Sequence, residues 1–574
     1  MRSVLGPFTL ALTLCSGTLA QSAVSPAPQT AAQQSTTDTP SGNQPIRDYI
    51  RAAWDTLSRS QTECKSVRDP KVTTAPILYL PAGFDTPPAI QKLHTDCGVE
   101  IEHLPHPIAH LGDLHPDELK RPGLLYLPNP YVVPGGRFNE MYGWDSFFIV
   151  LGLLSNNRID QAHGMAENFF FEINNYGAVL NANRTYYLTR SQPPLLAEMI
   201  REIHKYDKRE SAKPGCREQT AGTMLCAQRV SPLAWLATAY TTAQKDYALW
   251  TSPVHQAGAT GLSRYFDVGE GPVLEMADDS TYYPDAIKYL IAHPSEAQDY
   301  LVPASAGDAA SCDQKLTHVC VTAEVNGMRL SRDFYKGDRA DRESGYDTTF
   351  RFGAFSGSTH HIAPVCLNSL LYRYELDMAG FAKELGKPAD VKLWNSRAAA
   401  RKAAMQKYLW SDQQGAYVDY DFQKARQTDY TYATAFFPLW AGIATPAQAR
   451  QIAAILPKLE HEHGLAMSTR NSGQQWDLPF GWAPNQWFAV LGLRRYGFVA
   501  ESDRLAQKFR ADVETNYMRE GNIREKYDVD TGLTTTRVLF GYKANGIGFG
   551  WTNGVYLRLQ PDALAALPSG TGTK

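Results

Sequence analysis

Long stretches of the chain repeat apolar residues at helical spacing, and loops rich in Gly, Pro and Trp separate them. A repeat at three- and four-residue intervals predicts a helix with one buried face. The sequence shows no alternation of strands and helices of the βαβ kind and no series of short strands. The pattern therefore predicts an all-α fold of paired helices that carries its chemistry in the loops. The stretches that we expect to be helical are 46–59, 161–176, 195–206, 233–249, 361–385, 447–462 and 486–517.

The composition excludes several classes of protein. Of the 574 residues, 43% are hydrophobic and 20% are charged, which rules out collagen-like, coiled-coil and wholly disordered chains. The formal net charge is -3, so electrostatics give no reason to expect a nucleic-acid partner or an anionic membrane surface. Aromatic residues make up 11% of the chain, and aromatic faces can cover sugar rings as well as fill a core.

Residues 1–20 have the features of a secretory signal peptide. Arg2 precedes an apolar stretch from Val4 to Ala20, which ends in small residues. Cys15 offers a lipoprotein alternative, but the three residues before it lack the small side chains expected at such a processing site. These features predict a periplasmic or secreted location.

The rest of the chain divides by composition. Residues 21–45 are rich in Ser, Thr, Gln, Pro and Ala and are expected to form a flexible tether. No later segment has 18 uninterrupted apolar residues, so we expect no stable membrane insertion. We expect one catalytic domain over 46–562 and a disordered tail over 563–574.

Seven cysteines follow the signal peptide. Pairing of neighbours along the chain gives Cys64–Cys97, Cys216–Cys226 and Cys312–Cys320 and leaves Cys366 free. Buried free thiols are the alternative, because sequence alone does not fix connectivity. No pair has CxxC spacing, so a structural zinc site built from cysteines is not expected.

Several common site motifs can be set aside. Glu460–His463 is expected at a helix end before Gly464, and His360-His361 is expected to start a helix as surface histidines. The glycine-rich stretch 541–554 lacks the Lys-Ser/Thr of a phosphate loop, and no GxSxG is present.

Arg, Trp and carboxylates crowd together beside Gly and Pro in several loops. This composition suits a neutral polyhydroxylated ligand, because guanidinium and carboxylate groups bind hydroxyls while Trp covers the ring. Two carboxyl groups are then enough for glycoside hydrolysis, without a metal or cofactor. The alternative for any one loop is that its charged residues form salt bridges with one another and only cover the helical core. The loops are 134–145, 181–194, 338–347, 474–484 and 524–528, with 549–554 downstream.

These same loops resemble the signatures of α,α-trehalases. PGGRFNEMYGWD (134–145) is similar to the first trehalase signature, and QWDLPFGWAP (475–484) to the second. NRTYYLTRSQPP, DRADRESGYD and REKYD resemble further trehalase blocks in the same order, and the similarity spans about Tyr131 to Leu557. The resemblance implies an (α/α)6 toroid, trehalose as the substrate, no cofactor, no metal, and hydrolysis with inversion.

The resemblance also implies a catalytic pair. Asp347 of ESGYD corresponds to the general acid and Glu525 of REKYD to the general base. The acid should be partly desolvated, so that its pKa rises and it holds a proton. Inversion needs room for a water molecule, so the two carboxyl groups should lie about 6.5–9.5 Å apart. The alternatives are a capping carboxylate at Asp347 and a surface ion pair of Glu525 with Arg524 or Lys526.

A set of sugar-binding residues follows from the same blocks. Glu275 matches its block most loosely, Trp144 and Trp476 could instead be packing residues, and Trp482 is expected to be one. We expect Arg184 and Glu140 to be structural partners. The residues implied in binding are Arg137, Trp144, Asp145, Asn181, Arg190, Ser191, Gln192, Glu275, Arg342, Gly345 and Trp476.

The sequence departs from the family pattern in two places. Many relatives carry a glycine-rich lid ending in Glu-Tyr before FGW, whereas residues 538–548 here contain no carboxylate. Cys366 stands where relatives commonly have Asp. Two other functions therefore stay open: an inverting α-glucosidase for another disaccharide, and a sugar-binding protein that has lost catalysis.

Overall fold

The computed structural model describes residues 45–68, 75–115, 118–212, 218–220, 223–224, 229–278, 281–297, 299–309, 323–567 and 570. The chain divides into units 1–39 and 40–574, and every described residue belongs to the second. The predicted signal peptide, nearly all of the tether and the four cysteines Cys216, Cys226, Cys312 and Cys320 lie outside the described residues.

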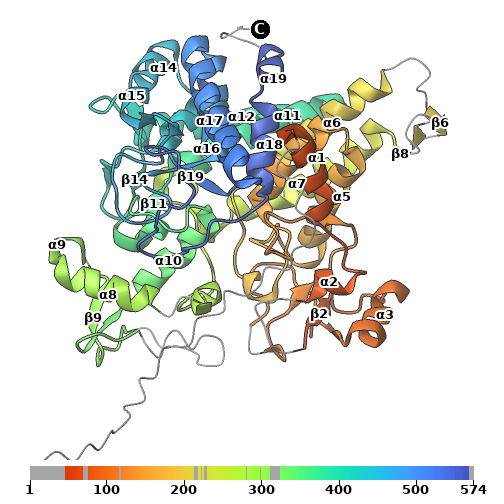
Figure 1. Ribbon diagram of the computed structural model, residues 1–574, viewed down its shortest axis with the longest axis horizontal. Coiled ribbons are helices and arrows are strands. Elements are labelled where there is room, and N and C mark those ends of the chain that lie inside the picture. Colours follow the sequence, from red (N-terminus) through yellow and green to blue (C-terminus); the bar gives the residue numbers. More distant parts are fainter. Residues whose placement is uncertain are drawn as a thin grey trace, which may run out of the picture. The chain divides into compact units, whose positions relative to one another are not determined.

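Six helices form a closed ring in the described part of the chain. Figure 1 shows the mostly helical region that contains this ring in its upper part. Each helix contacts the next one in chain order, and the last packs against the first. The inner helix α4 reads GWDSFFIVLGLLS and is buried on all sides except at Ser155, as expected of a helix that is apolar all round. The inner helices are α4 (Gly143–Ser155), α6 (Leu196–Ser211), α11 (Val365–Glu384), α13 (Phe437–Ala441), α16 (Ala483–Arg495) and α18 (Gly550–Arg558).

A second set of helices alternates with the inner ones along the chain. Helix α5 packs on α4 and α6, α7 on α6 and α11, α12 on α11, α17 on α16 and α18, and α1 on α18. This alternation of inner and outer helices is an (α/α)6 toroid, so the predicted fold is confirmed. The outer helices are α1 (Ile46–Thr56), α5 (Ile159–Asn175), α7 (Pro232–Trp250), α12 (Pro388–Tyr408), α14 (Pro446–Ala453) and α17 (Val499–Glu520).

Several helix boundaries differ from the prediction. The stretch 447–462 ends its helical part in α15 (Leu456–Leu459), and Glu460–His461 (β16) then pairs with Gly464–Leu465 (β17), so the predicted helix end at His463 is wrong. Residues 359–361 form a short 3-10 turn (η8), and α11 begins only after Pro364. The predicted loop 338–347 is mostly helical, because α10 (Arg332–Ser344) ends at Gly345 with φ 74°.

The C-terminal helix α19 (Pro561–Ala565) runs past residue 562, where a disordered tail was predicted. Leu564 is buried in the main hydrophobic core, and this packing explains why the chain stays helical there.

Short strands connect the loops above the ring. The pair β18 (Phe480–Trp482) and β19 (Lys526–Asp528) is antiparallel with Trp482 opposite Lys526, which joins two of the predicted site loops. The other antiparallel strands are β1 (Ser58–Arg59) with β5 (Tyr131–Val132), β11 (Ile362–Ala363) with β14 (Tyr420–Asp421) and β15 (Arg426–Gln427), β12 (Trp410–Ser411) with β13 (Ala416–Tyr417), and β6 (Glu218–Thr220) with β7 (Thr223–Met224) and β8 (Arg229–Val230).

A small βαβ unit lies before the ring, although the sequence predicted none. Strand β2 (Ile77–Leu80) pairs in parallel with β3 (Glu100–His103) across α3 (Pro88–Cys97), and β4 (Leu124–Leu125) pairs with the other edge of β2. Strands of four residues, one of them reading EIEH, are too short and too polar to produce a recognisable pattern.

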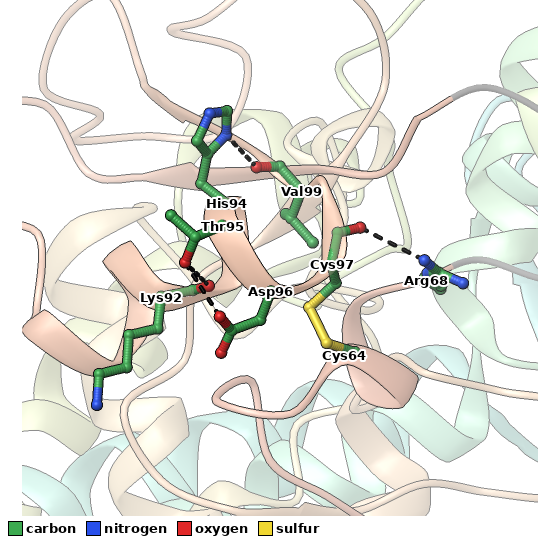
Figure 2. The surroundings of a disulfide bond; sticks show 8 residues. All are labelled: Cys64, Arg68, Lys92, His94, Thr95, Asp96, Cys97 and Val99. Carbon is green, nitrogen blue, oxygen red and sulfur yellow. Dashed lines mark hydrogen bonds between the residues drawn. A yellow bond between two sulfur atoms is a disulfide. The ribbon is translucent and has the colours of Figure 1, made fainter.

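A disulfide attaches α3 of this unit to α2 (Cys64–Val67). The bond joins Cys64 to Cys97, as predicted, and Arg68 donates a hydrogen bond to the Cys97 carbonyl (Figure 2). Cys366 is free and buried among the described residues, also as predicted.

A third group of elements has a hydrophobic cluster of its own. It contains α8 (Tyr282–Ala292), α9 (Pro294–Ala297), β9 (Leu301–Pro303), β10 (Met328–Leu330) and α10. Helix α10 leads from this group to the predicted general acid.

Candidate active site

The predicted site residues lie in the first turns of four inner helices or directly before these helices. Trp144 and Asp145 are in the first turn of α4, and Ser191 and Gln192 precede α6. The second signature leads into α16, and residues 538–549 lead into α18. The N-terminal ends of these helices therefore face the site, and their partial positive charge suits carboxylates.

Asp347 follows α10 and lies beside its last turn. Arg342 Nη1 lies 3.6 Å from Asp347 Oδ2, and the Gln475 amide donates a hydrogen bond to the Asp347 carbonyl. Burial raises the pKa of Asp347 to about 6, Arg342 opposes this rise, and Glu275 adds to it. The side chain keeps 26% of its surface accessible. It can therefore hold a proton in mildly acidic solution and still meet a ligand.

Glu525 is held by backbone groups and by a buried lysine. The Gly546 amide donates to Glu525 Oε2 at 3.0 Å, and the Glu525 amide donates to the Gly546 carbonyl at 3.0 Å. Lys526 Nζ lies 3.6 Å from the same Oε2 and donates to the Ala544 carbonyl at 2.9 Å. Burial lowers the pKa of Lys526, and Glu525 opposes that effect. One carboxylate oxygen is thus fixed by an amide and an ammonium.

The charges of Asp347 and Glu525 influence the pKa values of the same two neighbouring side chains. Burial raises the pKa of Asp145 well above its ordinary value, and the charges of Glu525 and then Asp347 raise it further. The pKa of Lys526 is lowered by burial, and the charges of Glu525 and Asp347 both oppose this fall. Asp347 and Glu525, which are far apart in sequence, therefore converge on one region that also contains Asp145.

Two arginines link the predicted binding loops. Arg190 pairs with Asp267 at 3.3 Å and with Glu275, and its guanidinium lies 4.7 Å from the centre of the Tyr187 ring. These contacts bring the loosely matched Glu275 to the arginine of another loop.

Arg342 connects the general-acid loop to two others. It pairs with Asp338 at 2.9 Å and donates to the Tyr542 hydroxyl at 3.1 Å. The Asn181 amide donates to the Arg342 carbonyl at 3.2 Å.

Close packing fixes the start of α4. Gln192 Oε1 accepts from the Trp144 amide at 2.9 Å, and a Cβ on Gly345 would lie 2.8 Å from the Trp144 ring. Gly345 is thus required both by its positive φ and by this contact. The Ser191 hydroxyl donates to the Val179 carbonyl at 2.6 Å.

The tryptophans form a buried aromatic layer. Trp476 stacks on Trp482 with ring centres 3.9 Å apart, and both rings are at most 2% exposed. Trp144 packs against Trp476 and Trp551. Lys526 Nζ lies 5.1 Å from the centre of the Trp482 ring, so the layer contacts the lysine beside Glu525. Trp482 is the packing residue that the sequence predicted.

Arg137 is the most exposed member of the predicted set. Its guanidinium lies 4.6 Å from the Phe138 ring centre, and its charge lowers the pKa of Lys526. Arg184 pairs with Glu140 at 2.6 Å, so their expected structural partnership is confirmed.

Sequence reasoning missed two residues at the site, Tyr542 and Asp267, and the buried position of a third, Lys526. The sequence offered Lys526 only as an alternative partner of Glu525 in a surface ion pair, whereas the lysine side chain is 3% exposed and lies beside the carboxylate. Tyr542, in the segment without a lid carboxylate, contacts Arg342. Asp267 holds Arg190, and nothing in its local sequence marks it.

Comparisons with known proteins agree with the geometry. The trehalase family profile matches residues 29–561. A cytosolic neutral trehalase of Saccharomyces cerevisiae is 35% identical over 88% of this chain and 69% of its own length. One of Neurospora crassa is 34% identical over 89% of this chain and 72% of its length. The solved structure of neutral trehalase Nth1 from Saccharomyces cerevisiae has a TM-score of 0.69 at 33% identity, covering 92% of this chain and 96% of that one.

The predicted periplasmic or secreted location is wrong by this comparison. The relatives above are named cytosolic enzymes, which conflicts with export. The prediction depended on an apolar stretch in residues 1–20, which lie outside the described residues. It therefore had only the amino-acid composition of this stretch to support it. Among the residues that the structure describes, no helix combines the length and apolar character needed to cross a bilayer.

A profile that matches most of the residues, relatives above 30% identity over most of both chains, and the shared ring of helices lead to one conclusion: the chain belongs to the trehalase family of glycoside hydrolases.

Proposed function

We propose that this chain hydrolyses α,α-trehalose to two glucose molecules in a single displacement, with Asp347 as general acid and Glu525 as general base. The observation that carries the proposal is the contrast between the two carboxyl groups. Burial gives Asp347 a pKa of about 6, whereas an amide and the Lys526 ammonium hold Glu525. Paired carboxyl groups in unlike environments are what acid–base hydrolysis of a glycoside requires.

The proposed reaction has one chemical step. The Asp347 proton moves to the bridging oxygen as the bond from this oxygen to the anomeric carbon breaks. Glu525 takes a proton from a water molecule whose oxygen bonds to that carbon from the opposite face. One glucose leaves with its configuration retained and the other is formed inverted, so α- and β-glucose appear in equal amounts.

The other predicted residues are proposed to form hydrogen bonds with the hydroxyl groups of the two sugar rings. Buried side chains that already hold one another need little reordering when a ligand binds. Trp144 and Trp476 are proposed as the support beneath the reacting ring, since both are buried in the aromatic layer. The proposed hydroxyl partners are Arg137, Asp145, Asn181, Arg190, Ser191, Gln192, Glu275, Arg342 and the backbone at Gly345.

Asp347→Asn and Glu525→Gln test the assignment. Each variant should lose at least about a thousandfold in kcat, because each removes a proton-transfer group while keeping the side chain's shape. Asp85→Asn, at an exposed position, is the matched control and should behave as wild type. Near-normal kcat in either site variant would overturn the role given to that residue.

The stereochemistry and the substrate provide independent tests. Proton NMR of the first turnovers should show equal α- and β-glucose, and α-glucose alone would contradict inversion. Azide added to Glu525→Ala should yield β-glucosyl azide, because the anion replaces the activated water. Faster hydrolysis of maltose or kojibiose would favour another α-glucosidase, and trehalose binding without glucose release would favour a sugar-binding protein.

A further inference from the structure

Two adjacent histidines and one aspartate converge at the far end of α10 from the active site. Asp333 lies in the first turn of α10, and His360 and His361 lie in the turn η8 (Thr359–His361). His360 Nε2 lies 2.9 Å and His361 Nε2 lies 3.4 Å from the same oxygen, Asp333 Oδ1. Atoms that could ligate a metal on the three residues all lie within 4.8 Å of one another.

This spacing can be compared with the distances between neighbouring ligand atoms at a zinc ion. Zinc binds imidazole nitrogen at about 2.0–2.1 Å and carboxylate oxygen at about 2.0–2.2 Å, so neighbouring ligand atoms of a tetrahedral site lie about 3.3–3.5 Å apart. The separation of 3.4 Å for His361 lies in this range, whereas the 2.9 Å for His360 is a hydrogen-bond length and would have to widen by about 0.4 Å. An ion can therefore be accommodated by small side-chain rotations, without a change in the backbone.

The backbone that presents the two imidazoles is already fixed. Arg264 Nη1 donates to the His360 carbonyl at 2.8 Å, and the Phe422 amide donates to the His361 carbonyl at 3.1 Å. Ligands held in place by outer contacts lose little entropy when a metal binds. The Arg264 guanidinium also places a positive charge nearby, which limits the affinity for a cation.

The three side chains differ in how much of their surface is exposed. The predicted surface position is wrong for His360, whose side chain is only 6% exposed, whereas that of His361 is 23% and that of Asp333 47% exposed. His360 Nδ1 is buried without a hydrogen-bond partner among the described atoms. An ion would enter from the Asp333 side and keep a position open for water, as zinc sites with three protein ligands do.

We propose that Asp333, His360 and His361 form a binding site for a divalent transition-metal ion, with zinc the best match. Neutral imidazole and carboxylate ligands suit Zn²⁺ better than Ca²⁺ or Mg²⁺, which prefer oxygen ligands alone. The ion would fasten the start of α10 to the end of the segment that begins at Asp347. Its role is structural: it stabilises the loop that carries the proposed acid and takes no part in hydrolysis.

The test is zinc binding by the whole chain without a histidine tag. After treatment with a chelator and dialysis, calorimetry with Zn²⁺ alone should give one site per chain, and the melting temperature should rise with Zn²⁺. Asp333→Asn and His361→Asn each remove one partly exposed ligand and should weaken binding at least about tenfold. Zinc-edge X-ray absorption should show two imidazole nitrogens and a carboxylate oxygen around the ion.

His463→Asn is the matched control, because the partly exposed His463 forms a similar pair with the buried Asp512 at 3.3 Å elsewhere in the fold. It should leave the zinc stoichiometry and affinity unchanged. Chelator should lower the melting temperature of the wild type but leave kcat for trehalose unchanged. Unaltered zinc binding in Asp333→Asn and His361→Asn, or an equal loss in His463→Asn, would mean that the ion binds elsewhere and that the two imidazoles only share hydrogen bonds with Asp333.

Discussion

Asp347 must hold a proton, which burial favours, and it must also reach the substrate, which requires some exposure. Its pKa of about 6 follows from burial, which Arg342 moderates. The protonated acid is lost as the pH rises, so kcat/KM should fall tenfold per pH unit above about 6. A pH series of kcat/KM from 4 to 9 measures this limb, and a flat profile through pH 8 would exclude Asp347 as the acid.

The same pKa has a consequence for stability. A carboxyl group whose pKa rises on folding, here from 3.8 to about 6, stabilises the fold below pH 3.8, and this contribution disappears as the pH rises through 6. Asp347→Asn stays neutral and should therefore be more stable than wild type at pH 7.5, by roughly 1–2 kcal/mol after allowance for its partial exposure. The difference should vanish near pH 3.5 in thermal melts, and Asp85→Asn should show no such pH dependence.

Lys526 is a positioning residue for the proposed base. Its ammonium contacts Glu525 Oε2 and the Ala544 carbonyl, so it connects the base to the segment before α18. Lys526→Met should lower kcat by roughly one hundredfold with little change in KM, because a misplaced base slows the chemical step more than binding. Lys392→Met, at an exposed position on α12, should leave both constants unchanged. A rise in KM alone would argue for a binding role instead.

Helices α4 and α18 approach so closely that only glycine fits between them. A Cβ on Gly554 would lie 1.9 Å from the Phe148 carbonyl oxygen, and one on Gly152 would lie 2.9 Å from the Gly554 Cα. Gly554→Ala should therefore destabilise the protein by about 3 kcal/mol in denaturant unfolding. Gly380→Ala, in the interior of α11 with open space around its Cα, should instead stabilise the protein by roughly 0.5–1 kcal/mol. If Gly554→Ala and Gly380→Ala changed the free energy of unfolding equally, the close contact between α4 and α18 would not determine how these helices pack.

The elements that could be predicted from the sequence are those whose burial follows a simple period. Helices α5, α6 and α7 lie close to their predicted ranges, since each buries an apolar stripe against neighbouring helices. The second half of α10 lies in the predicted loop 338–347, because its buried residues there are mostly charged. Asp338 and Arg342 pair with each other inside the fold. Hydrophobic periodicity cannot detect a helix whose core contacts are ion pairs.

The candidate site was predictable only in part for a similar reason. The resemblance placed Asp347, Glu525 and the binding loops, because their residues are contiguous in the signatures. Asp267 and Tyr542 reach Arg190 and Arg342 through the fold, from segments without a signature. Contacts of this kind depend on how the loops are brought together at the end of the ring, which local sequence does not encode.

At the scale of the whole molecule, the disulfide is a constraint outside the ring. It closes 33 residues between α2 and α3 and should contribute roughly 3–4 kcal/mol to the stability of the βαβ unit. Changing both Cys64 and Cys97 to Ser should lower the thermal stability and leave kcat at 25 °C unchanged, since no site residue lies in this unit. Reductant should lower the melting temperature of the wild type and have no effect on the double variant.

The closure of the ring also sets the order in which the protein can mature. Helix α18 packs against α4, and its Trp551 and Thr552 side chains donate to the carbonyls of Glu525 and Arg524. The helix that closes the ring thus also supports the proposed base. A nascent chain that still lacks residues 550–558 would be an open and inactive intermediate, so catalytic competence requires that synthesis has passed α18.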